Sequence, residues 1–188
     1  LFLQAGSGLA RCILAESIAG DTAVGHAVTH ARLVESLSGI TVDTTLEIER
    51  AIALELERIA IHIGDTAALC TDVAYQMGQV VNEALRTTII NTTQLWCGNR
   101  FGKGLIRPGG THYPLTETVL KQMLLTLADS GQRYRDIADN ILTSPSVLIR
   151  FDGIGQAHAT PEVVEAIRAA DVIVTGPSNP VVSIGPIV

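Results

Sequence analysis

The stretch VDTTLEIERAIALELERIAIHIGD, residues 42–65, constrains the fold more than any other part of the sequence. Its apolar residues recur with a helical period and together cover more than half of a helix circumference. They are Leu46, Ile48, Ala51, Ile52, Leu54, Leu56, Ile59, Ile61 and Ile63. A helix with so wide an apolar face is buried from several sides, so this stretch predicts a helical bundle.

Three other segments carry the same period. One covers residues 20–39 and ends at Gly39, where a left-handed cap is expected. The second covers residues 66–96, with Gly78 as a candidate break, and the third covers residues 115–142, with the central DSGQR as a candidate kink. We therefore expect residues 17–144 to form one bundle domain of about four long helices, after an unassigned segment, residues 1–16.

The pattern changes after Ser144. SVLIRF (residues 146–151) predicts a short strand, TPEVVEAIRAA (160–170) a helix, and DVIVTG (171–176) a buried strand before a Gly-Pro loop. This order is typical of a βαβ unit. The predicted fold class is therefore mainly α, a helical bundle with a short C-terminal βαβ-like α/β tail at residues 145–188.

Composition excludes some classes of protein. The net charge is -6, from 13 Lys and Arg against 19 Asp and Glu, so a basic surface for nucleic acid is not expected. The sequence is 47% apolar and only 17% charged, which favours apolar surface that faces a partner. It holds no uninterrupted apolar run long enough for a membrane-spanning helix, and its first residues lack the basic stretch of a signal peptide, so we expect a cytoplasmic protein.

Cysteine and histidine spacing bears on metal binding. Cys12, Cys70 and Cys97 are odd in number and form no CxxC pair, which favours free thiols over disulfides or a metal site. His26 and His30 lie one helical turn apart, a spacing that permits metal binding, but no third ligand is in prospect. We expect core or interface histidines and no metal.

Two groups of residues could carry chemistry. Glu55, Arg58, His62 and Asp65 share one helix face, either as ion pairs in a bundle seam or as a polar network that lines a cofactor or proton path. The loop CGNRFGKGLIRPGGTHYP, residues 97–114, could cradle an anion with its backbone N–H groups. A rigid docking loop is the alternative interpretation of that loop.

Five separated motifs and a sixth near residue 150 carry a resemblance to a known family. They are AGDTAVGHAVTHARLVES, ELERIAIHIGD, CTDVAY, GNRF, IRPGG and SVLIRFDGIG. Over about residues 17–155 the chain resembles the D (49-kDa) subunit of respiratory NADH:quinone oxidoreductase and the large subunit of group 4 membrane-bound nickel–iron hydrogenases. Such subunits are mostly helical, contact an iron–sulfur small subunit and membrane-arm subunits, and pass electrons to quinone or to protons.

The resemblance implies candidate site residues and a location. Residues that match the motifs or lie beside them, and that are expected near the partner's iron–sulfur cluster or the acceptor site, are Arg58, His62, Arg100, Arg107, Gly109 and Gly110. No catalytic residue is assigned. The chain alone is expected to bind no cofactor, with NADH or quinone acting at the level of the complex, peripheral to the inner face of the cell membrane. Gly20 and Gly102 depart from the respiratory subunits, which have Tyr and His there, so the electron acceptor stays open.

The last part of the chain resembles a second family. Residues 156–188 are similar to a fragment of the 2-phospho-L-lactate transferases of deazaflavin coenzyme synthesis, in which a GPSNP loop lies at the ligand cleft. The resemblance implies Ser178 and Asn179 as ligand-loop residues and a junction near Gly155. Three hypotheses follow: a redox-complex subunit, a binder of phosphate-containing ligands, or a nonfunctional chimera.

Overall fold

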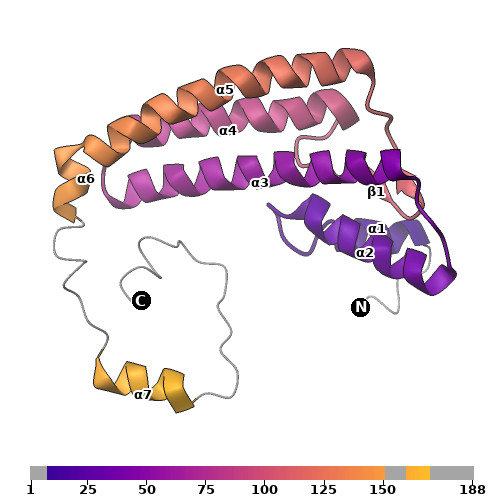
Figure 1. Cartoon of the computed structure of the whole chain (residues 1–188), viewed down its shortest axis with the longest axis horizontal. Coiled ribbons are helices and arrows are strands. Elements are labelled where there is room, and N and C mark those ends of the chain that lie inside the picture. The colour runs from indigo at the N-terminus through magenta and orange to yellow at the C-terminus, as the bar shows by residue number, and fades with distance from the viewer. Residues whose placement is uncertain (1–7, 151–159, 170–188) are drawn as a thin grey trace.

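The computed structural model describes residues 8–150 and 160–169, and in these ranges the chain is mainly α-helical, as predicted (Figure 1). The helices are α1 (Gly8–Ala15), α2 (Ala23–Ser38), α3 (Thr44–Asp72), α4 (Gln76–Cys97), α5 (Glu117–Thr143), α6 (Pro145–Arg150) and α7 (Pro161–Ala169). Strands β1 (Ile106–Arg107) and β2 (Gly110–Thr111) form an antiparallel hairpin between α4 and α5. The four long helices predicted from the sequence are α2 to α5.

Helices α3 and α4 form the centre of the bundle and run side by side in opposite directions (Figure 1). The buried residues recur at alternating steps of three and four on both helices, the pattern of a coiled-coil seam. On α3 they include Ala53, Leu56, Ala60, Ile63, Ala67 and Cys70, and on α4 Gly78, Asn82, Leu85, Ile89 and Trp96. Every second position on the α3 side is alanine, which lets the two helices approach closely.

The turn between α3 and α4 corrects one predicted boundary. Residues 66–72 continue α3, so the third predicted helix begins ten residues too early, and the break is at residues 73–75 and not at Gly78. Ala74 takes a left-handed φ of 56°, and the Tyr75 N–H donates to the Cys70 carbonyl at 2.7 Å. Gly78 instead allows close packing, since a Cβ there would lie 2.6 Å from Cys70 Sγ.

Helix α5 packs along α4 and is continuous, so the predicted kink at DSGQR is wrong. Its first turn is capped by Thr116, whose hydroxyl accepts the Val119 N–H at 3.3 Å. Met123 and Ile137 face the core. The helix is stable through Ser130 and Gly131 because apolar residues on either side of them keep the helical period.

The strand predicted at residues 146–151 is also wrong, since residues 145–150 form helix α6. Pro145 occupies the first helical position, where its missing N–H costs nothing, and the Ser144 carbonyl accepts the N–H groups of Val147 and Leu148. Val147 is buried against the bundle. The predicted helix at residues 160–170 is confirmed as α7, whereas the strand at 171–176 and the GPSNP loop lie outside the described residues.

At the other end of the bundle, α1 and α2 pack on each other, and α2 also contacts α3 and β1 (Figure 1). Helix α1 lies in the segment that the sequence left unassigned, and it buries Cys12 and Ala15. All three cysteines are free and buried, as predicted. Over the described ranges, no helix combines the length and apolar character needed to cross a bilayer.

Candidate functional site

The glycine-rich loop between α4 and α5 is fixed against α2 and α3 by close contact. Leu105 and Ile106 are buried in the core. A Cβ on Gly102 would lie 2.5 Å from Val24 Cγ2, and one on Gly110 would lie 2.7 Å from Leu46 Cδ1. Only glycine fits at these two positions, so the loop packs as a rigid part of the bundle.

Arg50 lies at the centre of this contact and is completely buried. Its guanidinium donates to both carboxylate oxygens of Glu35 at 2.5 and 3.0 Å and to Glu47 at 2.7 Å. It also donates to the main-chain carbonyls of Arg107 and Gly110, at 2.8 and 3.2 Å, while its Nε lies 3.4 Å from the Gly110 carbonyl. All five N–H groups therefore have acceptors within the chain, which leaves Arg50 no capacity for an external anion.

The charges around Arg50 shift pKa values in a consistent direction. The hydrogen bond from Arg50 holds the pKa of Glu35 below its ordinary value, and the hydrogen bond from Arg32 does the same for the pKa of Glu47. Glu35 in turn raises the pKa of Arg50. The cluster is therefore fully ionised near neutral pH and acts as a clamp between α2, α3 and the hairpin.

Two more carboxylates hold the loop. Glu16, just after α1, accepts the Gly104 N–H at 2.9 Å and forms an ion pair with Arg107. Glu49 on α3 accepts the Thr111 hydroxyl and the Leu115 N–H. Sequence analysis missed these residues because their loop partners lie far away along the chain. The detectable signal was a charged residue inside an otherwise apolar helix face.

The loop does cradle anions with its backbone, and these anions belong to the chain itself. The Gly104 N–H binds Glu16, and the Gly109 N–H donates to Glu35 at 2.7 Å. The arrangement fits the alternative interpretation of residues 97–114 as a rigid docking loop. Arg107, Gly109 and Gly110 meet at this clamp, and their proximity to a partner's cluster stays a prediction.

The other candidate residues are not brought to the same place. Arg58 is exposed and pairs with Glu55, the ordinary intrahelical pair considered from the sequence. His62 is exposed on α3 beside an apolar cleft, and Arg100 lies after α4 at a small cavity that also involves Glu57. Ser178 and Asn179 lie outside the described residues.

Glu57 has a role that the sequence did not reveal. Its two carboxylate oxygens accept the N–H groups of Val24 and Gly25 at 2.7 and 2.9 Å, so it caps the start of α2 from α3. Thr22, the residue before α2, makes no side-chain cap of its own. Burial raises the pKa of Glu57 despite these bonds.

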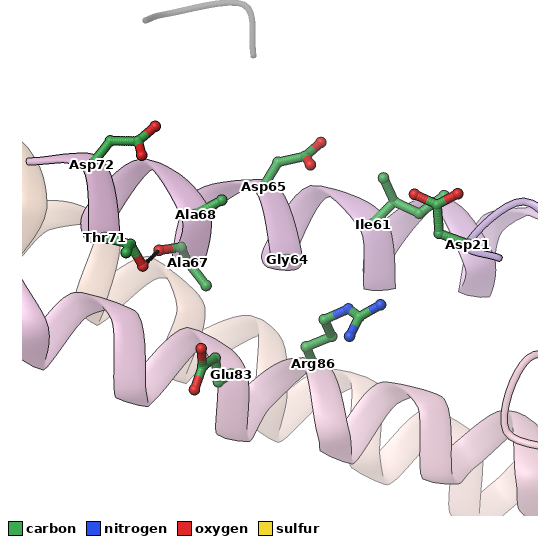
Figure 2. A pocket seen from close by; sticks show the side chains of 10 residues that line it. All are labelled: Asp21, Ile61, Gly64, Asp65, Ala67, Ala68, Thr71, Asp72, Glu83 and Arg86. Carbon is green, nitrogen blue, oxygen red and sulfur yellow. Dashed lines mark hydrogen bonds between the residues drawn. The ribbon is translucent and has the colours of Figure 1, made fainter. Parts of the chain in front are cut away.

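An acidic groove runs between α3 and α4 and has a volume of about 440 Å³ (Figure 2). Arg86 projects from α4 into the space between the helices and packs on Gly64, whose added Cβ would lie 3.0 Å from Arg86 Cδ. Carboxylates outnumber this guanidinium four to one, and they are Asp21, Asp65, Asp72 and Glu83. The groove favours cations over phosphate groups.

Metal and thiol chemistry find little support in the geometry. Across residues 8–150 and 160–169, no three His, Cys, Asp or Glu side chains gather as metal ligands. Burial raises the pKa of the Cys70 and Cys97 thiols, which keeps them protonated near neutral pH.

Comparison with known proteins gives two separate matches. The chain is 30% identical to the alpha chain of the membrane-bound hydrogenase of Pyrococcus furiosus over 128 residues, which is 68% of this chain and 29% of that protein. It is 33% identical to the D (49-kDa) subunit of the NADH-quinone oxidoreductase of Dehalococcoides mccartyi over 132 residues, 65% of this chain and 34% of that one.

The second match is to a transferase. A protein-family model described as "2-phospho-L-lactate transferase CofD" matches residues 105–188. The 2-phospho-L-lactate transferase of Methanopyrus kandleri is 48% identical over 77 residues, 40% of this chain and 24% of that protein. The chain resembles both families. It spans about a quarter to a third of the length of each of these relatives.

The two matches share part of the chain. A hydrogenase match over 68% of the chain and a transferase match over residues 105–188 are together longer than the 188 residues, so they overlap. The described part of the transferase match begins at Leu105, which is fully buried in the bundle, and contains α5. In that part, residues 105–150 and 160–169, the only strands are those of the two-stranded antiparallel hairpin.

Proposed function

We propose that this chain is part of a membrane-associated redox complex of the hydrogenase and NADH-quinone oxidoreductase type, where it docks on an iron–sulfur partner subunit near the electron-acceptor site. The observation that carries the proposal is the match to subunits of both kinds of complex across about two thirds of the chain. The bundle adds support because the motifs behind the resemblance lie in packed helices and in the clamped loop.

Exposed apolar side chains support a docking role. On α2, Leu33 and Leu37 lie one turn apart and are 58% and 81% exposed. On α1, Leu9 and Ile13 repeat the arrangement, at 58% and 51%. Large apolar side chains in such pairs are typical of protein interfaces. Since α2 contacts the hairpin, we propose that the partner covers α1, α2 and the loop, at the inner face of the membrane.

The proposal is tested by purifying the tagged full chain from its own cells in mild detergent. We expect a redox protein in stoichiometric amount, identified by mass spectrometry, with an iron–sulfur signal in electron paramagnetic resonance. Leu37→Asp on α2 is expected to abolish this association without changing the circular dichroism spectrum. Leu125→Asp is the matched control, because Leu125 is 68% exposed on α5, across the bundle from α2 (Figure 1). Purification of the unmodified chain without any redox partner would overturn the proposal.

A second candidate is phosphate-ligand binding by the C-terminal segment, favoured by the 48% identity to the Methanopyrus transferase. It predicts that the full chain binds a guanine nucleotide or a phospholactate donor and that Asn179→Ala removes this binding. Isothermal titration calorimetry decides, and no binding by the unmodified chain ends this candidate. A chain that binds neither a redox partner nor these ligands corresponds to the third hypothesis, a nonfunctional chimera.

A further inference from the structure

A second cleft lies apart from the clamped loop and the acidic groove, between the central parts of α3, α4 and α5. Its volume is about 390 Å³, within the range of small-molecule sites. Apolar side chains make most of its wall, namely Ile59 and Ile63 from α3, Ile89 from α4 and Leu127 from α5. Two hydroxyl groups, of Ser130 and Tyr134, complete the α5 side.

The Ser130 hydroxyl is buried and unused. Ser130 is 2% exposed, and its Oγ has no hydrogen-bond partner among the described residues. Helical hydroxyls elsewhere in the chain donate to the carbonyl four residues earlier, among them those of Thr29, Thr66, Thr71, Thr87, Thr88, Thr92, Thr126 and Thr143. Leaving a buried hydroxyl without a partner costs about 1–3 kcal/mol, so Ser130 is a donor that waits for an acceptor.

The Tyr134 hydroxyl has a defined direction. The Thr66 hydroxyl donates its only proton to the His62 carbonyl at 2.9 Å, so Tyr134 must be the donor in its own 2.9 Å bond to Thr66 Oγ1. Its proton is therefore committed, and towards the cleft it can only accept. Since Ser130 and Tyr134 are four residues apart on one face of α5, the cleft offers one free donor beside an apolar wall.

We propose that this cleft binds a small, largely apolar molecule that carries one carbonyl oxygen, which accepts a hydrogen bond from Ser130 Oγ. The apolar body lies against Ile59, Ile63, Ile89 and Leu127, and the oxygen satisfies the buried hydroxyl. This site is independent of the proposed redox function, since none of its wall residues takes part in the loop clamp.

The test uses the full chain with ¹³C-labelled Ile and Leu methyl groups and two probes of nearly the same shape. Acetophenone has a carbonyl oxygen, and α-methylstyrene has a CH₂ group in its place. We expect acetophenone to shift the methyl signals of Ile63, Ile89 and Leu127 and to bind more tightly than α-methylstyrene. Ser130→Ala should weaken acetophenone binding about three- to tenfold, the usual worth of one hydrogen bond, and leave α-methylstyrene binding unchanged.

Ser38→Ala at the exposed end of α2 is the matched control and should change neither affinity. Thermal unfolding checks the fold, and Ser130→Ala is expected to unfold at the same temperature as the unmodified chain or higher, because it removes an unpaired hydroxyl. The proposal is overturned if the cleft methyl groups do not respond to acetophenone. It is equally overturned if the two probes bind alike and Ser130→Ala does not distinguish them.

Discussion

Arg50→Met tests whether the clamp holds the loop. The substitution keeps much of the aliphatic volume but leaves the Glu35 carboxylate, buried with a side-chain exposure of 7%, without its ion-pair partner. Breaking a buried pair in this way costs about 3–5 kcal/mol, a large share of the total stability of an ordinary domain. The carbonyls of Arg107 and Gly110 lose their donor as well. We therefore expect the loop to detach at much lower urea concentration than in the unmodified chain.

The chain contains a natural reporter for this experiment. Trp96 is its single tryptophan, and the indole N–H donates to the Tyr113 carbonyl at the end of the loop, at 3.0 Å. Trp96 fluorescence therefore follows the loop, and far-ultraviolet circular dichroism follows the helices. In Arg50→Met the fluorescence transition should occur before the helical transition, and the two should coincide in the unmodified chain.

The control is Arg32→Met, which removes an ion pair to Glu47 from a side chain that is 58% exposed. Exposed pairs contribute about 0–1 kcal/mol, so this variant should unfold almost like the unmodified chain. The reasoning is refuted if Arg50→Met costs no more than Arg32→Met, or if its loop and helices still unfold together at unchanged urea concentration.

Three further predictions concern single side chains. Gly110→Ala should destabilise the chain by about 1–3 kcal/mol, because its Cβ would meet Leu46, whereas Gly131→Ala, with no atom nearer than 3.8 Å, should stabilise it by about 0.5–1 kcal/mol in the same urea titration. Asn82→Leu should raise the unfolding temperature, because the Asn82 Oδ1 is buried in the α3–α4 seam without a partner among the described residues; a lower temperature contradicts this. Glu57→Gln should change the pH dependence: the raised pKa of Glu57 means that the folded state binds its proton more tightly, so the unmodified chain should lose stability relative to the variant as pH rises above about 4.5, and a constant difference would refute this.

Periodicity was sufficient to predict the bundle, because burial of one helix face leaves a direct pattern in the sequence. The α3–α4 seam shows this, and so does Gly39, which takes the predicted left-handed conformation. The same pattern could not locate the end of α3, since apolar residues continue with a helical period through the turn at Ala74. Residues 146–151 were assigned to a strand because a short apolar run fits either structure, although the Ser-Pro pair at 144–145 was a usable helix-start signal.

The candidate site was less predictable, because its bonds join distant parts of the chain. Glycine density correctly indicated a loop with exposed N–H groups that bind anions, but it could not indicate which anions. Glu16 and Gly104 are 88 positions apart, and Glu35 and Gly109 are 74 apart. A single sequence carries no signal for such pairs, so Arg50, which organises the clamp, looked like one more polar residue of a helix.

The clamp also bears on the relation between the two resemblances. Residues 105–115 fall within the transferase match, yet the side chains that hold them, Glu16, Glu35, Glu49 and Arg50, all precede it. Gly102 and Gly110 add steric matching to Val24 and Leu46. So many specific contacts across residue 105 indicate that the loop and α5 belong physically to the bundle. A change of family inside this chain therefore has to come after the clamped loop, and the junction near Gly155 stays the prediction that agrees with the packing of α5 and α6.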